Sequence, residues 1–239
     1  VTLSNPSAGD IELQLNTTDG TAVAATADYD NSGITVTFPV GTTSQTVTVA
    51  SLEDSINELD ETFSIAVASV AQGTVGDTSD SGMGTILDDD GAPSLQIGDA
   101  SITEGGNLSF PITFSNASAA ETIITFRPSN GTASASDYTT TDVQITVPAG
   151  STTSIVTIPT TADAIAESDE TVVLAVESVD SGSLSDVSDT GTGTITDDDS
   201  TPSVQIDDVI TPEGNTLSFT VSLSNPSDLA ISLQIGTTN

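Results

Sequence analysis

Residues 190–199 read TGTGTITDDD, and the closing triplet Asp197–Asp199 repeats one that stands 109 residues earlier, at Asp88–Asp90. The seven residues before the later triplet alternate threonine with glycine or isoleucine, which is typical of a half-buried β-strand. The triplet therefore marks a strand end in a unit that occurs more than once.

The same spacing relates other segments of the chain. Asp28-Tyr29 recurs as Asp137-Tyr138, and residues 58–61 recur as residues 167–170. A unit of about 109 residues has the size of one β-sandwich domain and is much longer than a solenoid repeat. The spacing therefore predicts tandem domains.

The register of the repeats divides the chain into three parts. We expect residues 1–90 to form a repeat that lacks its first strand, residues 91–199 a complete repeat, and residues 200–239 the N-terminal strands of a third. Thr2–Pro6 matches Ser222–Pro226, so the sequence enters one repeat late and leaves another early. We therefore expect a segment of a longer tandem array.

The complete repeat has the pattern of an immunoglobulin-like, seven-stranded antiparallel β-sandwich. Short alternating segments are separated by Gly, Pro, Asn or Ser, and no run has helical spacing beyond a single turn within residues 162–170. The predicted strands are 94–102, 107–115, 121–127, 142–147, 152–158, 171–179 and 190–196.

The charge of the chain excludes several function classes. It has 35 Asp and Glu residues against one Arg, with no Lys, His or Cys, for a formal net charge of −34. Triads that need His or Cys, zinc fingers and disulfides are excluded, and such a surface repels nucleic acid and anionic lipid. No apolar run approaches the length of a membrane span. We expect Arg127 to form a surface salt bridge of little energetic value.

Strand topology gathers carboxylates at one end of the complete repeat. If the strands alternate in direction, the segments that follow the first, third, fifth and seventh strands share that end. Eight of the sixteen acids between residues 91 and 199 fall there: Glu104, Asp137, Asp163, Glu167, Glu170, Asp197, Asp198 and Asp199. Two charges about 4 Å apart repel by roughly 4 kcal/mol at a protein surface, and no Lys is present to offset this. Ca²⁺, which takes six to eight oxygen ligands, is the cation such a set favours.

These motifs, in this order, resemble the Calx-beta domain. The resemblance rests on Glu104-Gly105, Gly131–Ala133, Asp137-Tyr138, Pro148–Gly150 and the acids from Asp163 to Asp199. It implies a seven-stranded sandwich that binds calcium through acids in these segments. Tandem copies of the domain occur in sodium/calcium exchangers, integrin-type receptors and large bacterial surface proteins.

The resemblance also implies the calcium ligands. In the complete repeat they are the eight acids named above, and in the third repeat Glu213. In the first repeat they are Asp28, Asp54, Glu58, Glu61, Asp88, Asp89 and Asp90. The family often has two adjacent acids before the loop glutamate, where this chain has Ala162-Asp163 and Glu53-Asp54. From the number of ligands we expect two or more calcium ions per complete repeat.

We expect a structural rather than a catalytic function. The leading hypothesis is an extender segment of a long secreted or cell-surface protein, an adhesin or filament of bacterial origin, in which Ca²⁺ stiffens the junctions between neighbouring repeats. One alternative is a calcium sensor that moves a partner, and another is a filament subunit joined to other copies by strand exchange. Catalysis is not expected, because only paired carboxylates remain and no aromatic-lined cleft is evident.

Several other residues have assigned roles. We expect Tyr29 and Tyr138 to be structural. Asp60 and Asp169 are weaker ligand candidates. Four acids precede the last strand of a repeat and belong to the opposite end, either as solvated loop acids or as part of an interdomain cation site: Asp77, Asp80, Asp186 and Asp189.

Overall fold

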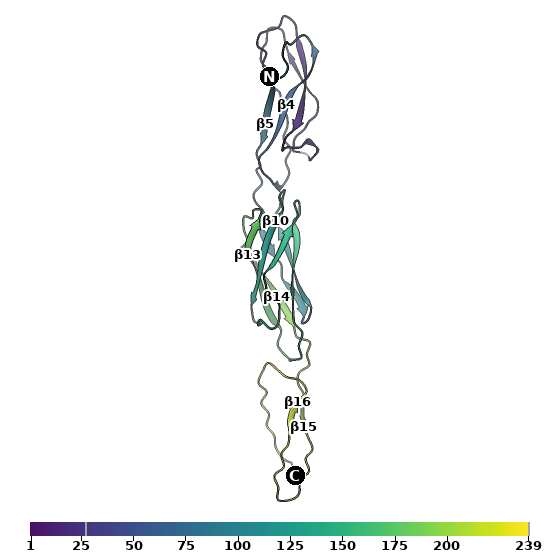
Figure 1. Cartoon of the computed structure of the whole chain (residues 1–239), viewed down its shortest axis with the longest axis vertical. Helices are drawn as coiled ribbons and strands as arrows, with labels where there is room; N and C mark the ends of the chain where they lie inside the picture. The colour runs from purple at the N-terminus through teal and green to yellow at the C-terminus, as the bar shows by residue number, and fades with distance from the viewer. Residues whose placement is uncertain (27, 239) are drawn as a thin grey trace. The chain divides into compact units, whose positions relative to one another are not determined.

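The computed structural model describes residues 1–26 and 28–238 and divides into two compact units, Val1–Gly91 and the remainder from Ala92 onward. Figure 1 shows that strands and loops make up nearly all of it. Within the described residues, the helical part is limited to the 3-10 turn η1 (Ala24–Thr26). None of the described residues belongs to a helix with the length and apolar character that crossing a membrane requires.

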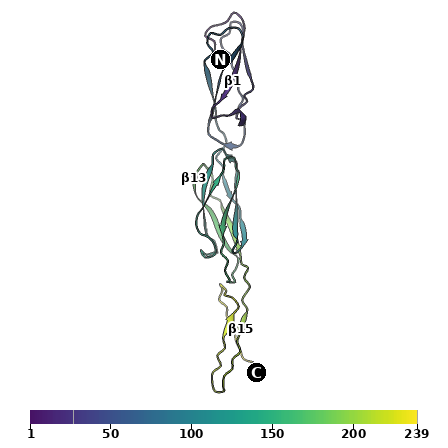
Figure 2. The same ribbon diagram turned by 45° about the vertical axis from the view of Figure 1, so that its right-hand side comes forward.

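The complete repeat in the second unit is a sandwich of two sheets, seen from two sides in Figures 1 and 2. The order of the larger sheet is β11-β10-β13-β14-β7 and that of the smaller is β12-β8-β6. Their bounds are β6 (Leu95–Ile97), β7 (Ala100–Thr103), β8 (Asn107–Phe114), β10 (Thr122–Asn130), β11 (Val143–Val147), β12 (Thr153–Pro159), β13 (Glu170–Ser181) and β14 (Thr190–Thr196). The short strand β9 (Ala117–Ser118) lies between β8 and β10 in the sequence. The β-sandwich prediction is confirmed.

The core of this sandwich follows from the alternation of side chains along the strands. In β8 every second residue is buried from Leu108 to Ile112, and in β10 the residues Ile124 and Phe126 are fully covered. Side chains from both sheets meet in one apolar cluster. Because successive side chains of a strand point to opposite faces, the threonines and serines between them face outward.

The first strand differs from the prediction. Residues 94–102 form two strands rather than one: β6 pairs antiparallel with β8 in one sheet, and β7 pairs parallel with β14 in the other. The chain crosses between the sheets at Gly98, where a Cβ atom would lie 2.6 Å from Cγ of Pro111. Asp99 then accepts the Thr192 N–H at 2.8 Å, which ties the crossing to β14. The expectation of purely antiparallel strands is therefore wrong for this one pair.

The glycines of the quoted stretch are required by close packing. A Cβ atom on Gly191 would lie 2.5 Å from Cγ2 of Ile97, and one on Gly193 would lie 2.7 Å from Cδ1 of Leu108. Real Cβ atoms do not approach carbon this closely, so β14 lies directly against the side chains of the opposite sheet. The alternation of Thr and Gly thus lets the last strand cover the core with its backbone.

The first unit repeats part of this design. Its sheet has the order β2-β1-β4-β5 over the core residues Ile11, Leu13, Leu15, Val36 and Phe38. The bounds are β1 (Ile11–Asp19), β2 (Ile34–Phe38), β4 (Glu61–Gln72) and β5 (Ser81–Ile86), with β3 (Ile56–Asn57) as a short additional strand. β5 is the last strand of its sheet, whereas its counterpart β14 pairs with β7. A groove of about 710 Å³ lies along β5 and is lined in part by Phe63, Ile65 and Val67.

Residues 200–238, which the sequence predicts to begin a third repeat, have little regular structure. Their strands β15 (Val204–Ile206) and β16 (Val221–Leu223) form one antiparallel pair, and their apolar side chains are largely exposed, with Ile210 98% accessible. The segment 162–170 of the complete repeat has no helical turn.

Candidate metal sites

Strand pairing places four chain segments of the complete repeat at one end. β7 and β14 run parallel with Thr103 opposite Thr196, so Glu104 and Asp197 leave the sheet side by side. β13 begins at Glu170, which lies opposite Ile195 of β14. Two loops reach the same end, the one after β10 with Asp137 and the one after β12 with Asp163 and Glu167.

The first cluster at this end, the Glu104 cluster, consists of Glu104, Asp163 and Asp199. One carboxylate oxygen from each lies within 4.8 Å of the others. Oε1 of Glu104 and Oδ2 of Asp199 are buried and have no hydrogen-bond partner in the described structure. Because a buried polar atom without a partner costs free energy, this pair of oxygens favours a bound cation.

Electrostatics within the Glu104 cluster oppose the ionised state of its members. Burial is the main cause that raises the pKa of Glu104, and the charge of Asp163 adds to it, although the Asp163 backbone N–H acts in the other direction. Burial likewise raises the pKa of Asp199, followed by the charge of Asp197. Both carboxyl groups therefore lack a compensating positive charge.

The second cluster, the Glu170 cluster, consists of Asp137, Glu167 and Glu170, whose ligand oxygens also lie within 4.8 Å of one another. Burial, and next a hydrogen bond to Asp137, raise the pKa of Glu170 to about 7. Burial also tends to raise the pKa of Asp137, but hydrogen bonds from Ser134, whose N–H lies 2.6 Å from Oδ2, outweigh it, and the pKa of Asp137 is lowered. Without a cation, Asp137 is thus the more acidic member of the pair, and Glu170 is the one that keeps its proton to higher pH.

The first unit contains the repeat of the Glu170 cluster. Asp28, Glu58 and Glu61, here called the Asp28 cluster, have ligand oxygens within 4.8 Å of one another. Burial raises the pKa of both Glu58 and Glu61, with the charges of neighbouring Asp residues adding to it. A hollow of about 150 Å³ opens beside this cluster, several times the volume of one water molecule. The same three-carboxylate arrangement therefore occurs in both repeats.

The two Asp triplets adopt the same turn. The N–H of Asp199 lies 3.3 Å from Oδ1 of Asp197, and that of Asp90 lies 3.4 Å from Oδ1 of Asp88. In each triplet the outer two residues are half-buried and the middle one is exposed. Of the six triplet residues, Asp199 is the one that belongs to a three-carboxylate cluster of the described residues. The other five contribute through their negative charge to the raised pKa values of neighbouring acids.

The remaining predicted ligands have varied positions. The charges of Asp54, Asp88 and Asp90 raise the pKa of Glu58, after burial, so these acids lie near the Asp28 cluster. Asp89 contributes in the same way, after burial, to the raised pKa of Asp90. The charge of Asp197 contributes, after burial, to the raised pKa of Glu167, and the charge of Asp198 contributes in the same way to that of Glu104. Glu213 is exposed and belongs to none of the three-carboxylate clusters in the described residues.

Several acids instead accept backbone hydrogen bonds. Oδ1 of Asp77 accepts the Ser79 N–H and Oδ1 of Asp186 accepts the Ser188 N–H, both at 2.9 Å. Oδ2 of Asp189 accepts the Ile97 N–H at 2.8 Å, which connects β6 to the start of β14. Within their own units, these acids stabilise turns and strand ends. The bonds to Asp99 and Asp189 join residues more than 90 positions apart, and no local sequence signal identifies them.

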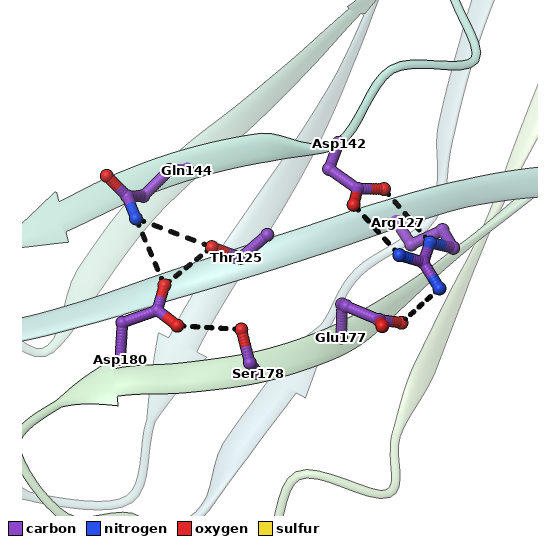
Figure 3. Close-up of polar contacts among 7 residues, drawn as sticks. All are labelled: Thr125, Arg127, Asp142, Gln144, Glu177, Ser178 and Asp180. Atoms are coloured by element: carbon purple, nitrogen blue, oxygen red, sulfur yellow. Dashed lines mark hydrogen bonds and ion pairs between the residues drawn. The ribbon is translucent and has the colours of Figure 1, made fainter.

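Arg127 lies away from the clusters, on the outer face of the larger sheet. It binds Asp142 through two nitrogens, at 3.0 and 2.9 Å, and Glu177 at 2.7 Å (Figure 3). Its side chain is 51% exposed, so the predicted surface salt bridge is confirmed. On the same face, Asp180 accepts hydrogen bonds from Thr125, Gln144 and Ser178 (Figure 3). These acids have partners and are not ligand candidates.

Both tyrosines are structural, as predicted. Tyr29 and Tyr138 are 2% and 3% exposed, and each hydroxyl group donates a hydrogen bond of 2.5 Å, to Asp19 and Asn130 respectively. Each tyrosine follows a cluster aspartate directly, so its packing fixes the backbone that positions Asp28 or Asp137.

The clusters have the geometry of oxygen-ligand metal sites. Two oxygens bound to one Ca²⁺ at about 2.4 Å each lie at most about 4.8 Å apart, and the ligand oxygens of each cluster lie within 4.8 Å of one another. The ligand atoms are carboxylate oxygens, the type that hard divalent cations prefer. A bound cation would also relieve the repulsion that raises the pKa of these acids.

Comparisons with known proteins identify the family. The family model described as the Calx-beta domain matches the chain twice, at residues 1–90 and 88–199. The chain therefore belongs to the Calx-beta family, and it contains tandem copies of the domain.

Solved structures of similar fold include the apo form of the Calx CBD1 domain, with 18% identity, a TM-score of 0.41, and coverage of 46% of this chain and all of that one. The calcium binding domain CBD12 of CALX1.1 has 18% identity and a TM-score of 0.37, covering 78% of this chain and 87% of that one. CBD12 from CALX1.2 has 20% identity and a TM-score of 0.34, covering 73% and 70%. No curated protein matches the chain.

Proposed function

We propose that this chain is a calcium-stabilised extender segment of a long secreted or cell-surface protein, in which Ca²⁺ at the repeat ends holds neighbouring repeats at fixed angles. The observation that carries the proposal is the recurrence of one three-carboxylate cluster, Asp28/Glu58/Glu61 and Asp137/Glu167/Glu170, at a constant spacing. Isolated surface acids are common, but the same geometry in two repeats of different surrounding sequence indicates a retained ligand set.

Calcium suits these clusters better than other cations do. Their ligands are oxygens without nitrogen or sulfur, and their loops offer the irregular geometry that Ca²⁺ accepts and Mg²⁺ does not. Membership in the Calx-beta family supports the same ion. With a Glu104 cluster and a Glu170 cluster, a complete repeat would hold two ions or more. We assign no catalytic role to these carboxylates.

An extracellular setting agrees with the proposed chemistry. Sites in extracellular modules bind Ca²⁺ with Kd on the order of 10⁻⁴ to 10⁻³ M, because calcium is plentiful there. The chain has no Lys, and Pro128 follows its single Arg127, so trypsin-like proteases have no efficient cleavage position. The same site occurs in successive repeats, which favours a structural scaffold over a calcium sensor. We propose that the parent protein is a bacterial adhesin or filament.

The mechanism is thermodynamic linkage. Cations that bind the folded clusters, and not the unfolded chain, stabilise each repeat by about 2.7 kcal/mol per site at a hundredfold excess over Kd. Ligands that come from several loops of one end become fixed relative to one another. A junction built on those loops then loses its freedom to bend.

Small-angle X-ray scattering of the chain with and without calcium tests the extender role. We expect Ca²⁺ to increase the radius of gyration of the chain and to narrow the range of distances between its repeats, because fixed junctions keep the repeats apart. Mg²⁺ at equal concentration controls for charge screening. Identical scattering curves in calcium and in chelator would exclude the extender mechanism.

A further inference from the structure

The groove along β5 is an open form of a place that the complete repeat fills with its own strands. In the complete repeat the backbone of β14 packs against the opposite sheet: a Cβ atom on Gly191 would lie 2.5 Å from Cγ2 of Ile97 and 3.1 Å from Cδ1 of Phe110. A Cβ atom on the equivalent Gly82 of β5 would meet, among the described residues, one atom within 4 Å, Cγ2 of Ile65 at 3.5 Å. The groove of about 710 Å³ therefore has room for side chains of an opposite sheet.

The backbone on both sides of this groove has the character of a strand edge. β5 is the last strand of its sheet, whereas β14 also pairs with β7. Residues 44–50 are equivalent to β12, which pairs with β8 along its whole length. Within the described part of the chain, these residues form a single bridge, between Ser44 and Thr2. Exposed strand edges are templates for pairing with another extended segment.

Residues 203–223 match the strands β6, β7 and β8 of the complete repeat at the constant spacing of 109 residues. Their pairing matches as well. Ile206 of β15 lies opposite Val221 of β16, and the equivalent residues Ile97 and Ile112 pair in the same register between β6 and β8. The segment therefore has the local structure of the strands that fill the corresponding place beside β14.

The apolar side chains of this segment are uncovered. Leu217 and Phe219 are 49% and 55% exposed, whereas their equivalents Leu108 and Phe110 are fully buried. The exposed set also includes Val204, Ile206, Val221 and Leu223. Because burial of apolar surface drives protein association, this exposure favours binding to a groove of matching shape.

We propose that the groove along β5 binds residues 203–223 of a second copy of this chain by strand exchange. The segment would occupy the groove as β6, β7 and β8 occupy the corresponding place in the complete repeat. This inference goes beyond the proposed function and requires no cation. Each copy has the groove in its first unit and the segment in its third repeat, so the contact is heterologous and links copies head to tail.

The exchange loses few contacts where the groove is already occupied. Val1–Leu3 lie at the position that Val221–Leu223 would enter, and the two triplets differ only by Thr and Ser. The Leu3 N–H donates to the carbonyl oxygen of Thr43 at 2.8 Å. The entering triplet would form the equivalent bond, so the burial of the other exposed side chains is a net gain.

A polar contact would fix the register of the entering segment. In the complete repeat, Oδ2 of Asp189 accepts the N–H of Ile97 at 2.8 Å. The equivalent of Asp189 in the first unit is Asp80, which lines the groove. The equivalent of Ile97 in the segment is Ile206, whose N–H would bind Asp80. Groove and segment thus match in polar as well as apolar groups.

Sedimentation velocity of the full chain between about 1 and 100 μM, at one fixed calcium concentration, tests the inference. We expect dimers and longer species to increase with concentration. Phe219→Asp places a charge at a position that is buried in the complete repeat, and should weaken association at least about a hundredfold. Leu229→Asp is the matched control and should associate like wild type, because Leu229 is 67% exposed in the same repeat but lies outside the segment.

Gly82→Val tests the groove itself. Its Cβ atom has space in the free first unit, where the nearest atom is 3.5 Å away, but in the filled groove Ile206 would lie where Ile97 lies, 2.5 Å from such an atom in the complete repeat. The variant should therefore keep the wild-type circular dichroism spectrum and lose self-association.

An equimolar mixture of Phe219→Asp and Gly82→Val gives the sharpest result. The first variant keeps an intact groove and the second keeps an intact segment. Each alone should be monomeric, and the mixture should form a one-to-one complex and nothing longer. A wild-type chain that stays monomeric at about 100 μM, or equal association by wild type and both variants, would overturn the inference.

Discussion

The complete repeat is expected to melt about 10 °C or more higher in about 10 mM CaCl₂ than in chelator, as measured by differential scanning calorimetry. At a Kd of 10⁻⁴ to 10⁻³ M, this concentration stabilises by about 1.4 to 2.7 kcal/mol per ion. Two ions, one in each cluster, double that value. In a domain of about 100 residues, each kcal/mol shifts Tm by about 4 to 8 °C.

Magnesium separates site binding from charge screening in that experiment. An equal concentration of MgCl₂ screens surface charges to the same extent but fits an irregular oxygen site poorly. We expect MgCl₂ to give only a small part of the calcium effect. Coincident melting curves in calcium and magnesium would mean that the clusters do not bind Ca²⁺ specifically and are ordinary surface acids.

The effect of Glu170→Gln on the free energy of unfolding is expected to have opposite signs in the absence and in the presence of calcium. Without calcium at pH 8, the variant should be more stable than wild type by about 1 to 2 kcal/mol, because it removes a carboxylate that burial and Asp137 hold in an unfavourable ionised state. With calcium, the variant should be less stable, because it has lost a charged ligand of the Glu170 cluster. Thermal unfolding of both proteins under both conditions measures the reversal.

The pH dependence of this effect has a definite sign. The pKa of Glu170 is raised from 4.5 to about 7 in the ion-free protein, so its ionisation destabilises the fold as pH rises through this interval. The calcium-free advantage of the variant should vanish near pH 4.5 and be complete above pH 7. Glu177→Gln is the control, since Glu177 lies on the same strand β13 but pairs with Arg127 (Figure 3). An advantage of equal size in that variant would contradict the explanation.

Most strands were predictable because one face of each is buried and the other is exposed to solvent, so apolar and polar residues alternate in the sequence. The alternation in residues 107–115 and 152–158 predicts β8 and β12 closely, and residues 190–196 match β14. The division of residues 94–102 was not predictable, because one alternating run can serve two sheets in turn. The crossing at Gly98 depends on Pro111 of another strand, and such a contact leaves no local signal.

The candidate site was partly predictable from topology. Strand direction alone indicates that Glu104, Glu170 and Asp199 share one end of the sandwich. How the acids divide into two clusters depends on the path of the irregular loop between β12 and β13, for example the turn in which the Ile165 N–H binds Asp163 at 2.7 Å. Tertiary contacts set such paths.

The clusters also change how the net charge of −34 is understood. Acids such as Asp142, Asp180 and Asp189 have partners in the protein itself. The cluster acids have raised pKa values at Glu58, Glu61, Glu104, Glu167 and Glu170, in each case with burial as the main cause. Much of the formal charge therefore lies where a divalent cation would neutralise it.

Isothermal titration of the chelated chain with CaCl₂ tests the central claim most directly, with the triple variant Asp197→Asn, Asp198→Asn, Asp199→Asn in parallel. The account predicts saturable binding of two or more ions per complete repeat by the wild-type chain, and fewer ions in the variant because Asp199 is a ligand of the Glu104 cluster. A wild-type chain without saturable binding, or a variant that binds as many ions as wild type, would contradict it.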